Sequence, residues 1–182
     1  MSEEHAAASA LALLDEFGSL NEILSASPWW LERIVGCHCA RLIAGANHLL
    51  ARSLAEPLRA RSLIGDRSAV AALLRRLIGH ADVEMLIVLH LDGVQRLLCY
   101  DLVATGDGGS VEFDPRKILV HAIAREASGI IVAHNHPSGN ASPSHADFSA
   151  SKKLARAAQG LGITVHDHLV IAGGDVRSAM AT

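Results

Sequence analysis

Three residues in one short stretch carry the side chain types that bind transition metals in proteins. Residues 131–148 read IVAHNHPSGNASPSHADF and hold His134, His136 and Asp147. Side chains at positions i and i+2 of an extended chain point to the same side, so both imidazoles can meet at one point while Asn135 faces away. Ten residues separate His136 from Asp147, enough for the chain to turn back. The spacing predicts a zinc site with these three ligands and water in the fourth position.

Ser144 stands three residues before Asp147, and the pair has two compatible interpretations. S-x-x-D is typical of a helix start, with Ser144 as the N-cap and Asp147 at the third helical position. It also places a hydroxyl beside a metal ligand. Pro137, Gly139 and Pro143 predict a fixed turn between the histidines and this helix. The joint pattern of H-x-H, ten residues and Asp is far more specific than either part alone.

The composition predicts a globular protein in a reducing compartment. Of the 182 residues, 50% are hydrophobic and only 3% are aromatic, so we expect an aliphatic core. The net charge of −3 indicates no general affinity for phosphate backbones. Three cysteines make a poor disulfide framework, and Cys37-x-Cys39 lacks the second pair that would complete a metal site.

We expect a cytoplasmic protein that makes no contact with membranes. The sequence begins MSEEHAAASALALL, and this acidic start is unlike a signal peptide. No apolar run is judged long enough to span a bilayer.

Two domains are expected, a small all-helical domain over 1–62 and an α/β domain over 63–182. In the first, helical patterns cover 6–17, begin again at Ser19-x-x-Glu22 and at Ser27-Pro28, and run from about 40 to 53. The segment SLAEPLRARSLIG, residues 53–65, is interpreted as a linker.

The second domain is expected to be a mixed α+β sheet with flanking helices. A two-residue hairpin is predicted at Asp92-Gly93, and a helix is predicted from Asp114-Pro115 to Gly129. The other expected elements are strands in 83–91, 94–104 and 129–134, one or two final strands in 163–173, and helices over 68–79 and 145–159.

The segment HNHPSGNASPSHAD resembles the metal motif of the JAB/MPN-plus (JAMM) metalloproteases. More widely, the chain resembles the RadC family, the bacterial JAB-domain proteins often labelled DNA repair proteins. The similarity covers LLDEFGSLNEIL, VEMLIVLHLD, DPRKILVHAIAREASGIIVAHNHPSG and LGITVHDHLVI. It implies a JAB fold, related to that of cytidine deaminase, after a degenerate helix-hairpin-helix region.

The resemblance implies roles for two more residues. Glu84 would be the general acid/base and Ser144 would stabilise the oxyanion. From the residues alone, Glu84 could equally be a solvent-facing strand residue. Asp167 and His168 are candidate partners of a metal-bound histidine, because such ligands usually need one. The loop TGDGGSVEF is expected to lie near the metal and to select substrates.

Two functions remain open at this point. One is a zinc metallohydrolase that cleaves a peptide or isopeptide bond in a protein substrate. The other is a DNA-repair-associated or protein-binding module with a structural or inactive zinc site. A zinc deaminase is set aside because the chain has no C-x-x-C, and a zincin because it has no H-E-x-x-H.

DNA binding by residues 1–62 is weakly supported by the sequence. A helix-hairpin-helix usually grips phosphate through a G-x-G hairpin, but here VGCHCA has Gly36 followed by His38. Five arginines, no lysine and seven acidic residues give the segment a net charge of −2. We therefore expect a structural or protein-binding module.

Overall fold

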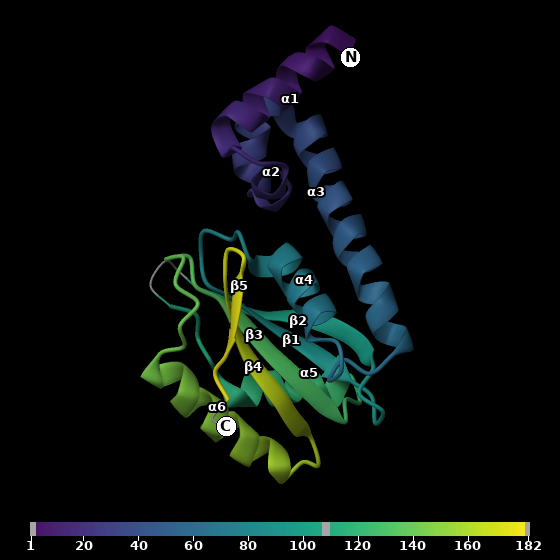
Figure 1. The fold of residues 1–182 in the computed structure, drawn as a ribbon, viewed down its shortest axis with the longest axis vertical. Helices are drawn as coiled ribbons and strands as arrows, with labels where there is room; N and C mark the ends of the chain where they lie inside the picture. Colours follow the sequence, from purple (N-terminus) through teal and green to yellow (C-terminus); the bar gives the residue numbers. More distant parts are fainter. Residues whose placement is uncertain (1–2, 107–109, 181–182) are drawn as a thin grey trace. The chain divides into compact units, whose positions relative to one another are not determined.

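The computed structural model describes residues 3–106 and 110–180. Its contacts divide the chain into two compact units, Met1–Ser53 and Leu54–Thr182 (Figure 1). Residues 107–109, in the loop expected to select substrates, lie outside the described residues.

The first unit is helical, with α1 (Glu3–Phe17), α2 (Leu20–Ser25) and most of α3 (Pro28–Ala60). Gly18 follows α1 at a positive φ of 74°, and the Ser19 side chain caps α2 as predicted. The backbone leaves helical geometry at Gly36, where φ is 77° and ψ is 163°. The buried residues that hold this unit together are Leu13, Ile23, Leu31 and Ala40.

The linker predicted over 53–65 is wrong for its first eight residues, because α3 continues to Ala60. Ala55 and Leu58 lie one helical turn apart and are 1% and 0% exposed, within the core of the second unit. Their burial favours the helix despite Pro57 inside it.

Among the described residues, α3 is the one helix long and apolar enough to cross a membrane by length and composition alone. No such run was predicted from the sequence. A single helix of this kind is weak evidence for insertion, because core helices also pass this test.

The second unit contains the expected mixed sheet, in the order β2-β1-β3-β4-β5. The strands are β1 (Met85–Leu91), β2 (Leu97–Thr105), β3 (Gly129–Asn135), β4 (Thr164–Ala172) and β5 (Asp175–Ser178). β3 and β4 are parallel, and the other neighbouring pairs are antiparallel. The parallel pair requires a crossover connection, and this connection carries the Pro-rich loop and α6 (His145–Gln159).

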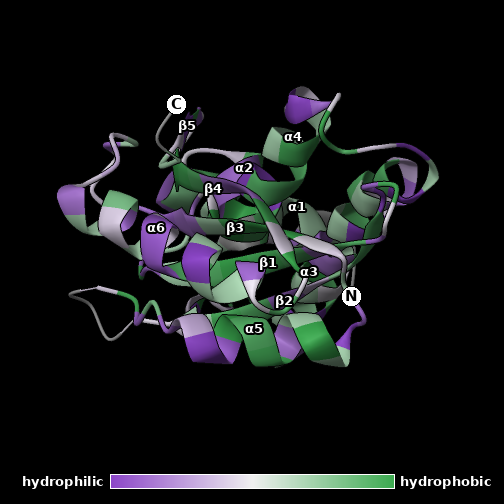
Figure 2. Ribbon diagram, turned by 90° about the horizontal axis from the view of Figure 1, so that it is seen from below, coloured by the Kyte–Doolittle hydropathy of each residue, from purple (hydrophilic) through white to green (hydrophobic). Residues whose placement is uncertain are grey.

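Helices cover both faces of this sheet (Figures 1 and 2). On one face, α4 (Arg67–Ile78) packs against alternate residues of the central strands, including Ile87, Leu89 and Ile131. On the other face, α5 (Pro115–Ala124) and α6 pack against the residues between them, including Leu86, Val88, Ile130 and Val132. Burial of both faces explains why β1 and β3 read as continuous apolar runs.

Two boundaries differ from the predictions. The β1–β2 connection spans 92–96 instead of two residues, because the Asp92 carboxylate accepts the Val94 and Arg96 N–H groups in a wider turn. Helix α5 ends at Ala124 instead of Gly129, which is the first residue of β3. Gly129 suits this strand because the His166 ring occupies the space that a Cβ would fill.

Candidate metal centre

The end of β3 and the start of α6 bring the three predicted ligands together. His134 belongs to β3 and His136 follows it directly, while Asp147 lies in the first turn of α6. His134 pairs with Leu86 of β1, whose side chain packs on the α5/α6 face, so the imidazole points to the same face as α6.

The ligand atoms of His134, His136 and Asp147 all lie within 4.8 Å of one another. The two Nε2 atoms are 3.0 Å apart, and they lie 3.3 and 3.8 Å from the carboxylate oxygens of Asp147. Ligands at the usual distance from a tetrahedral zinc ion are about 3.3 Å apart. The observed separations and the mixed nitrogen and oxygen donors therefore fit such an ion, and the group could hold a metal.

Each imidazole has a partner on its other nitrogen. His136 Nδ1 lies 2.8 Å from the Asn140 backbone carbonyl oxygen, and His134 Nδ1 lies 2.9 Å from His168 Nε2. These contacts turn both Nε2 atoms towards Asp147. Metal-bound histidines typically have such partners, and His168 was one of the two residues predicted to act in this way.

The electrostatics favour the protonation states that metal ligands need. Burial lowers the pKa of His134, and burial together with the nearby His134 lowers the pKa of His168 to about 3. Burial tends to raise the pKa of Asp147, but the Ser144 hydrogen bonds outweigh it and keep this pKa below its ordinary value. Near neutral pH the imidazoles of His134 and His168 are therefore neutral and the carboxylate is ionised.

Ser144 forms a capping box with Asp147. Its hydroxyl donates to Asp147 Oδ2 at 2.7 Å, its backbone N–H donates to the same oxygen at 2.7 Å, and its Oγ lies 3.2 Å from the Asp147 nitrogen. The capping interpretation is confirmed. The same bonds hold the Asp147 carboxylate beside the histidines.

Glu84 lies immediately before β1, partly buried, and its carboxylate accepts the Val111 N–H at 2.8 Å. Its charge opposes the lowering of the pKa of His134. Among the described residues it is not part of the group that could hold a metal.

Asn135 anchors the chain on either side of Glu84, a function that the sequence analysis missed. Its side chain oxygen accepts the Met85 N–H at 2.7 Å, and its Nδ2 donates to the carbonyls of Ala81 and Val83 at 3.1 and 3.0 Å. The residue is 1% exposed and faces away from the ligands, as predicted. The available sequence signal was an amide residue between two histidines whose side chains point to the opposite side of the chain.

Ser151 is the second residue that the sequence analysis missed. Its hydroxyl lies 2.6 Å from His168 Nδ1 and 2.7 Å from the backbone oxygen of Asp147, one helical turn earlier. It is 2% exposed. Its spacing of four residues from Asp147 was the only local signal.

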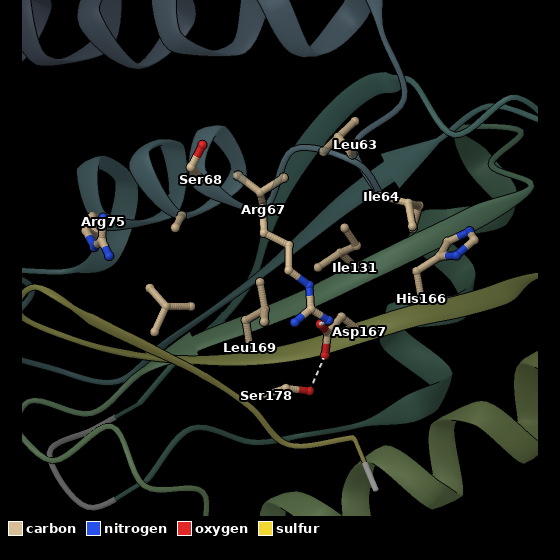
Figure 3. A pocket seen from close by; sticks show the side chains of 13 residues that line it. Leu63, Ile64, Arg67, Ser68, Arg75, Ile131, His166, Asp167, Leu169 and Ser178 are labelled. Atoms are coloured by element: carbon tan, nitrogen blue, oxygen red, sulfur yellow. Dashed lines mark hydrogen bonds and ion pairs between the residues drawn. The ribbon is translucent and has the colours of Figure 1, made fainter. Parts of the chain in front are cut away.

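Asp167 does not contact the histidine ligands, because it points to the α4 face. Its carboxylate accepts the His168 N–H and the Ser178 hydroxyl, and it forms an ion pair of 3.2 Å with Arg67. Arg67, Asp167 and Ser178 line a cavity of about 320 Å³ together with Ile131 and Leu169 (Figure 3). The sheet separates this cavity from the metal group. Asp167 therefore stabilises β4 beside His168 and does not act as the hydrogen-bond partner of a metal ligand.

The comparisons with known proteins agree with this architecture. The family model described as the RadC-like JAB domain matches residues 64–182. The chain is 34% identical to a UPF0758 protein of Rhodobacter capsulatus over 91% of its length and 78% of that protein. It is 36% and 37% identical to UPF0758 proteins of Burkholderia thailandensis and Burkholderia mallei, over 93% of the chain in each case.

The chain spans 65% and 62% of the lengths of the two Burkholderia proteins, which is less than two thirds. The UPF0758 names state no activity. These matches assign the chain to a family, because the domain model covers residues 64–182 and the identities extend over most of the chain. The chain belongs to the RadC family, and residues 64–182 are its RadC-like JAB domain.

Proposed function

We propose that this protein is a cytoplasmic, zinc-dependent metallohydrolase that cleaves a peptide or isopeptide bond in a protein substrate. The observation that carries the proposal is the convergence of His134 Nε2, His136 Nε2 and an Asp147 carboxylate beside Glu84. Three protein ligands leave one position of a tetrahedral ion open, as catalytic zinc sites require.

His134, His136 and Asp147 would hold the ion. Zinc supplies a nucleophile near neutral pH by acidifying a water molecule, and it also polarises the carbonyl group under attack. A buried His134 and a Ser144-bonded Asp147 keep the ligands in the required protonation states.

Glu84 would move the proton in this reaction. Val111 holds one of its oxygens, which fixes the carboxylate while leaving it lone pairs to accept a proton. Glu84 takes the proton from the attacking water and returns it to the leaving amine, which closes the cycle without a second acid.

Ser144 would donate a hydrogen bond to the oxyanion of the tetrahedral intermediate. Its hydroxyl now donates to Asp147 Oδ2, so it must rotate away from that oxygen to serve the substrate. The Ser144 backbone N–H keeps its bond to Asp147 during this rotation and retains the position of the ligand.

The experiment is cleavage of a peptide library and of isopeptide-linked protein conjugates by the full chain, followed by mass spectrometry. We expect products that disappear with a chelator and return with added zinc. Glu84→Gln should retain zinc while its rate falls about 10²–10⁴-fold. Unchanged turnover in this variant would remove Glu84 from the mechanism. Loss of zinc would make Glu84 a ligand and favour the alternative, a binding module with a closed structural site.

A further inference from the structure

A chain of buried hydrogen bonds leads from His134 back to the helix that carries Asp147. His134 Nδ1 lies 2.9 Å from His168 Nε2, and His168 Nδ1 lies 2.6 Å from the Ser151 hydroxyl. That hydroxyl lies 2.7 Å from the Asp147 carbonyl oxygen. His134, His168 and Ser151 are 3%, 0% and 2% exposed, which leaves little room for water to replace any link.

The directions of these bonds follow from the last group in the chain. A carbonyl oxygen can only accept, so the single hydroxyl proton of Ser151 points to Asp147. The Ser151 oxygen must then accept the proton of His168 Nδ1. A neutral His168 is left with an unprotonated Nε2, which accepts from His134 Nδ1. The lone pair of His134 is thereby placed on Nε2, the atom that faces Asp147.

We propose that Ser151 and His168 are positioning residues that fix His134 in the tautomer and orientation that bind metal through Nε2. The inference rests on the proposed metal site and adds residues that act on it indirectly. Both ends of the chain lie near Asp147, so the orientation of one ligand is tied to the helix turn that carries another. The Phe113 ring, 5.0 Å from the His168 ring, packs beside the middle of the chain.

His136 offers an internal contrast. Its Nδ1 lies 2.8 Å from the Asn140 backbone carbonyl, so its tautomer needs no side chain partner. Of the two histidine ligands, only His134 has its Nδ1 bonded to a side chain, which a substitution can remove. Removing the Ser151 hydroxyl should therefore change the tautomers of His134 and His168, while His136 keeps its proton on Nδ1.

The first measurement is zinc affinity, by competition with a chromophoric chelator, in the full chain. Ser151→Ala should bind zinc more weakly, by up to the roughly 10–100-fold that the loss of a direct partner of a ligand costs, because Ser151 acts on His134 through His168. Ser149→Ala is the matched control, because Ser149 is exposed on the same helix, and it should bind like the wild type. Ser151→Thr keeps a hydroxyl that can reach the carbonyl four residues earlier, so it should restore most of the affinity.

The second measurement is ring ¹⁵N NMR, which reports the tautomer of each histidine, with and without zinc. In the wild type we expect the proton on Nδ1 of His134, His136 and His168. In Ser151→Ala the signals of His134 and His168 should show a changed tautomer, while the signal of His136 Nδ1 should still report a protonated nitrogen. If Ser151→Ala only loosened the packing, the ¹⁵N signals would not show a changed tautomer at His134 and His168 alone.

A proton on Nε2 of His168 in the wild type would overturn the proposal. So would zinc binding in Ser151→Ala equal to that of Ser149→Ala. If the wild type binds no zinc at this group, the proposed function fails, but the tautomer of His168 in the metal-free protein still decides the chain of bonds. The NMR experiment needs no variant, so it holds even if Ser151→Ala does not fold.

Discussion

Replacing Asn135 with Ala should destabilise the domain without removing the metal. Three backbone groups would lose their partner, namely the Met85 N–H and the carbonyls of Ala81 and Val83. Each bond contributes about 0.5–1.5 kcal/mol net. All three residues are half-buried, so water replaces part of the loss, and we expect a total of about 1.5–4 kcal/mol.

The assay is equilibrium unfolding in urea together with a thermal melt. For a unit of this size, each kcal/mol shifts the melting temperature by roughly 3–5 °C, so Asn135→Ala should melt about 5–20 °C lower. Asn140→Ala is the control, because this exposed residue supports His136 through its backbone carbonyl, and its side chain accepts one hydrogen bond, from the Ser142 N–H, against three bonds at Asn135. It should cost less than about 1 kcal/mol.

The same variant separates the metal site from Glu84. Asn135 faces away from the ligands, so zinc should stay bound, whereas hydrolysis should fall because the segment around Glu84 loses its anchor. A destabilisation no larger than that of Asn140→Ala would refute the reasoning. So would loss of zinc from a folded Asn135→Ala.

Three further predictions concern other parts of the molecule. Ser144→Ala should lose about 1 kcal/mol of stability with its cap, measured by urea unfolding, and the pKa of Asp147 should rise by NMR; an unchanged pKa would contradict the assigned hydrogen bonds. The hydrogen bond with Arg125 is the main reason why the pKa of Asp101 lies below its ordinary value of 3.8. This bond therefore contributes stability above pH 3.8, and the stability is lost as pH falls through the lower pKa that Asp101 has in the folded protein. Asp101→Asn should therefore be less stable at neutral pH and lose less stability than the wild type between pH 4 and 2, and parallel stability curves would count against this network. The full chain should bind duplex DNA weakly in fluorescence anisotropy, and nanomolar, steeply salt-dependent binding would show that the net charge of −2 over 1–62 misled us.

The elements that sequence predicted well are those with a strong local signal. Helix α6 runs over His145–Gln159, the range expected from its cap and its periodicity. The two boundaries that were wrong have different causes. The Asp92 side chain opens the hairpin to five residues through bonds to Val94 and Arg96, which are local but lie outside the Asp92-Gly93 pair used for the prediction. The His166 ring favours Gly129 in a strand, and this contact joins residues too far apart in the sequence for a short-range pattern to contain it.

The ligand spacing was readable because H-x-H fixes a direction on a strand. The supporting residues were harder to predict. Asn135 contacts backbone groups about fifty residues earlier in the chain, and Ser151 on α6 contacts His168 on β4. Such partners become visible only when β1 and β4 are placed beside β3. The sequence therefore predicted which atoms meet but only partly what holds them.

The most direct test of the account is the zinc content of purified protein by elemental analysis. The full chain should carry about one zinc per molecule. A folded His134→Ala/His136→Ala variant should carry almost none, while His38→Ala/His145→Ala, which removes two exposed histidines, should keep it all. Full zinc content in the His134→Ala/His136→Ala variant would contradict the central claim.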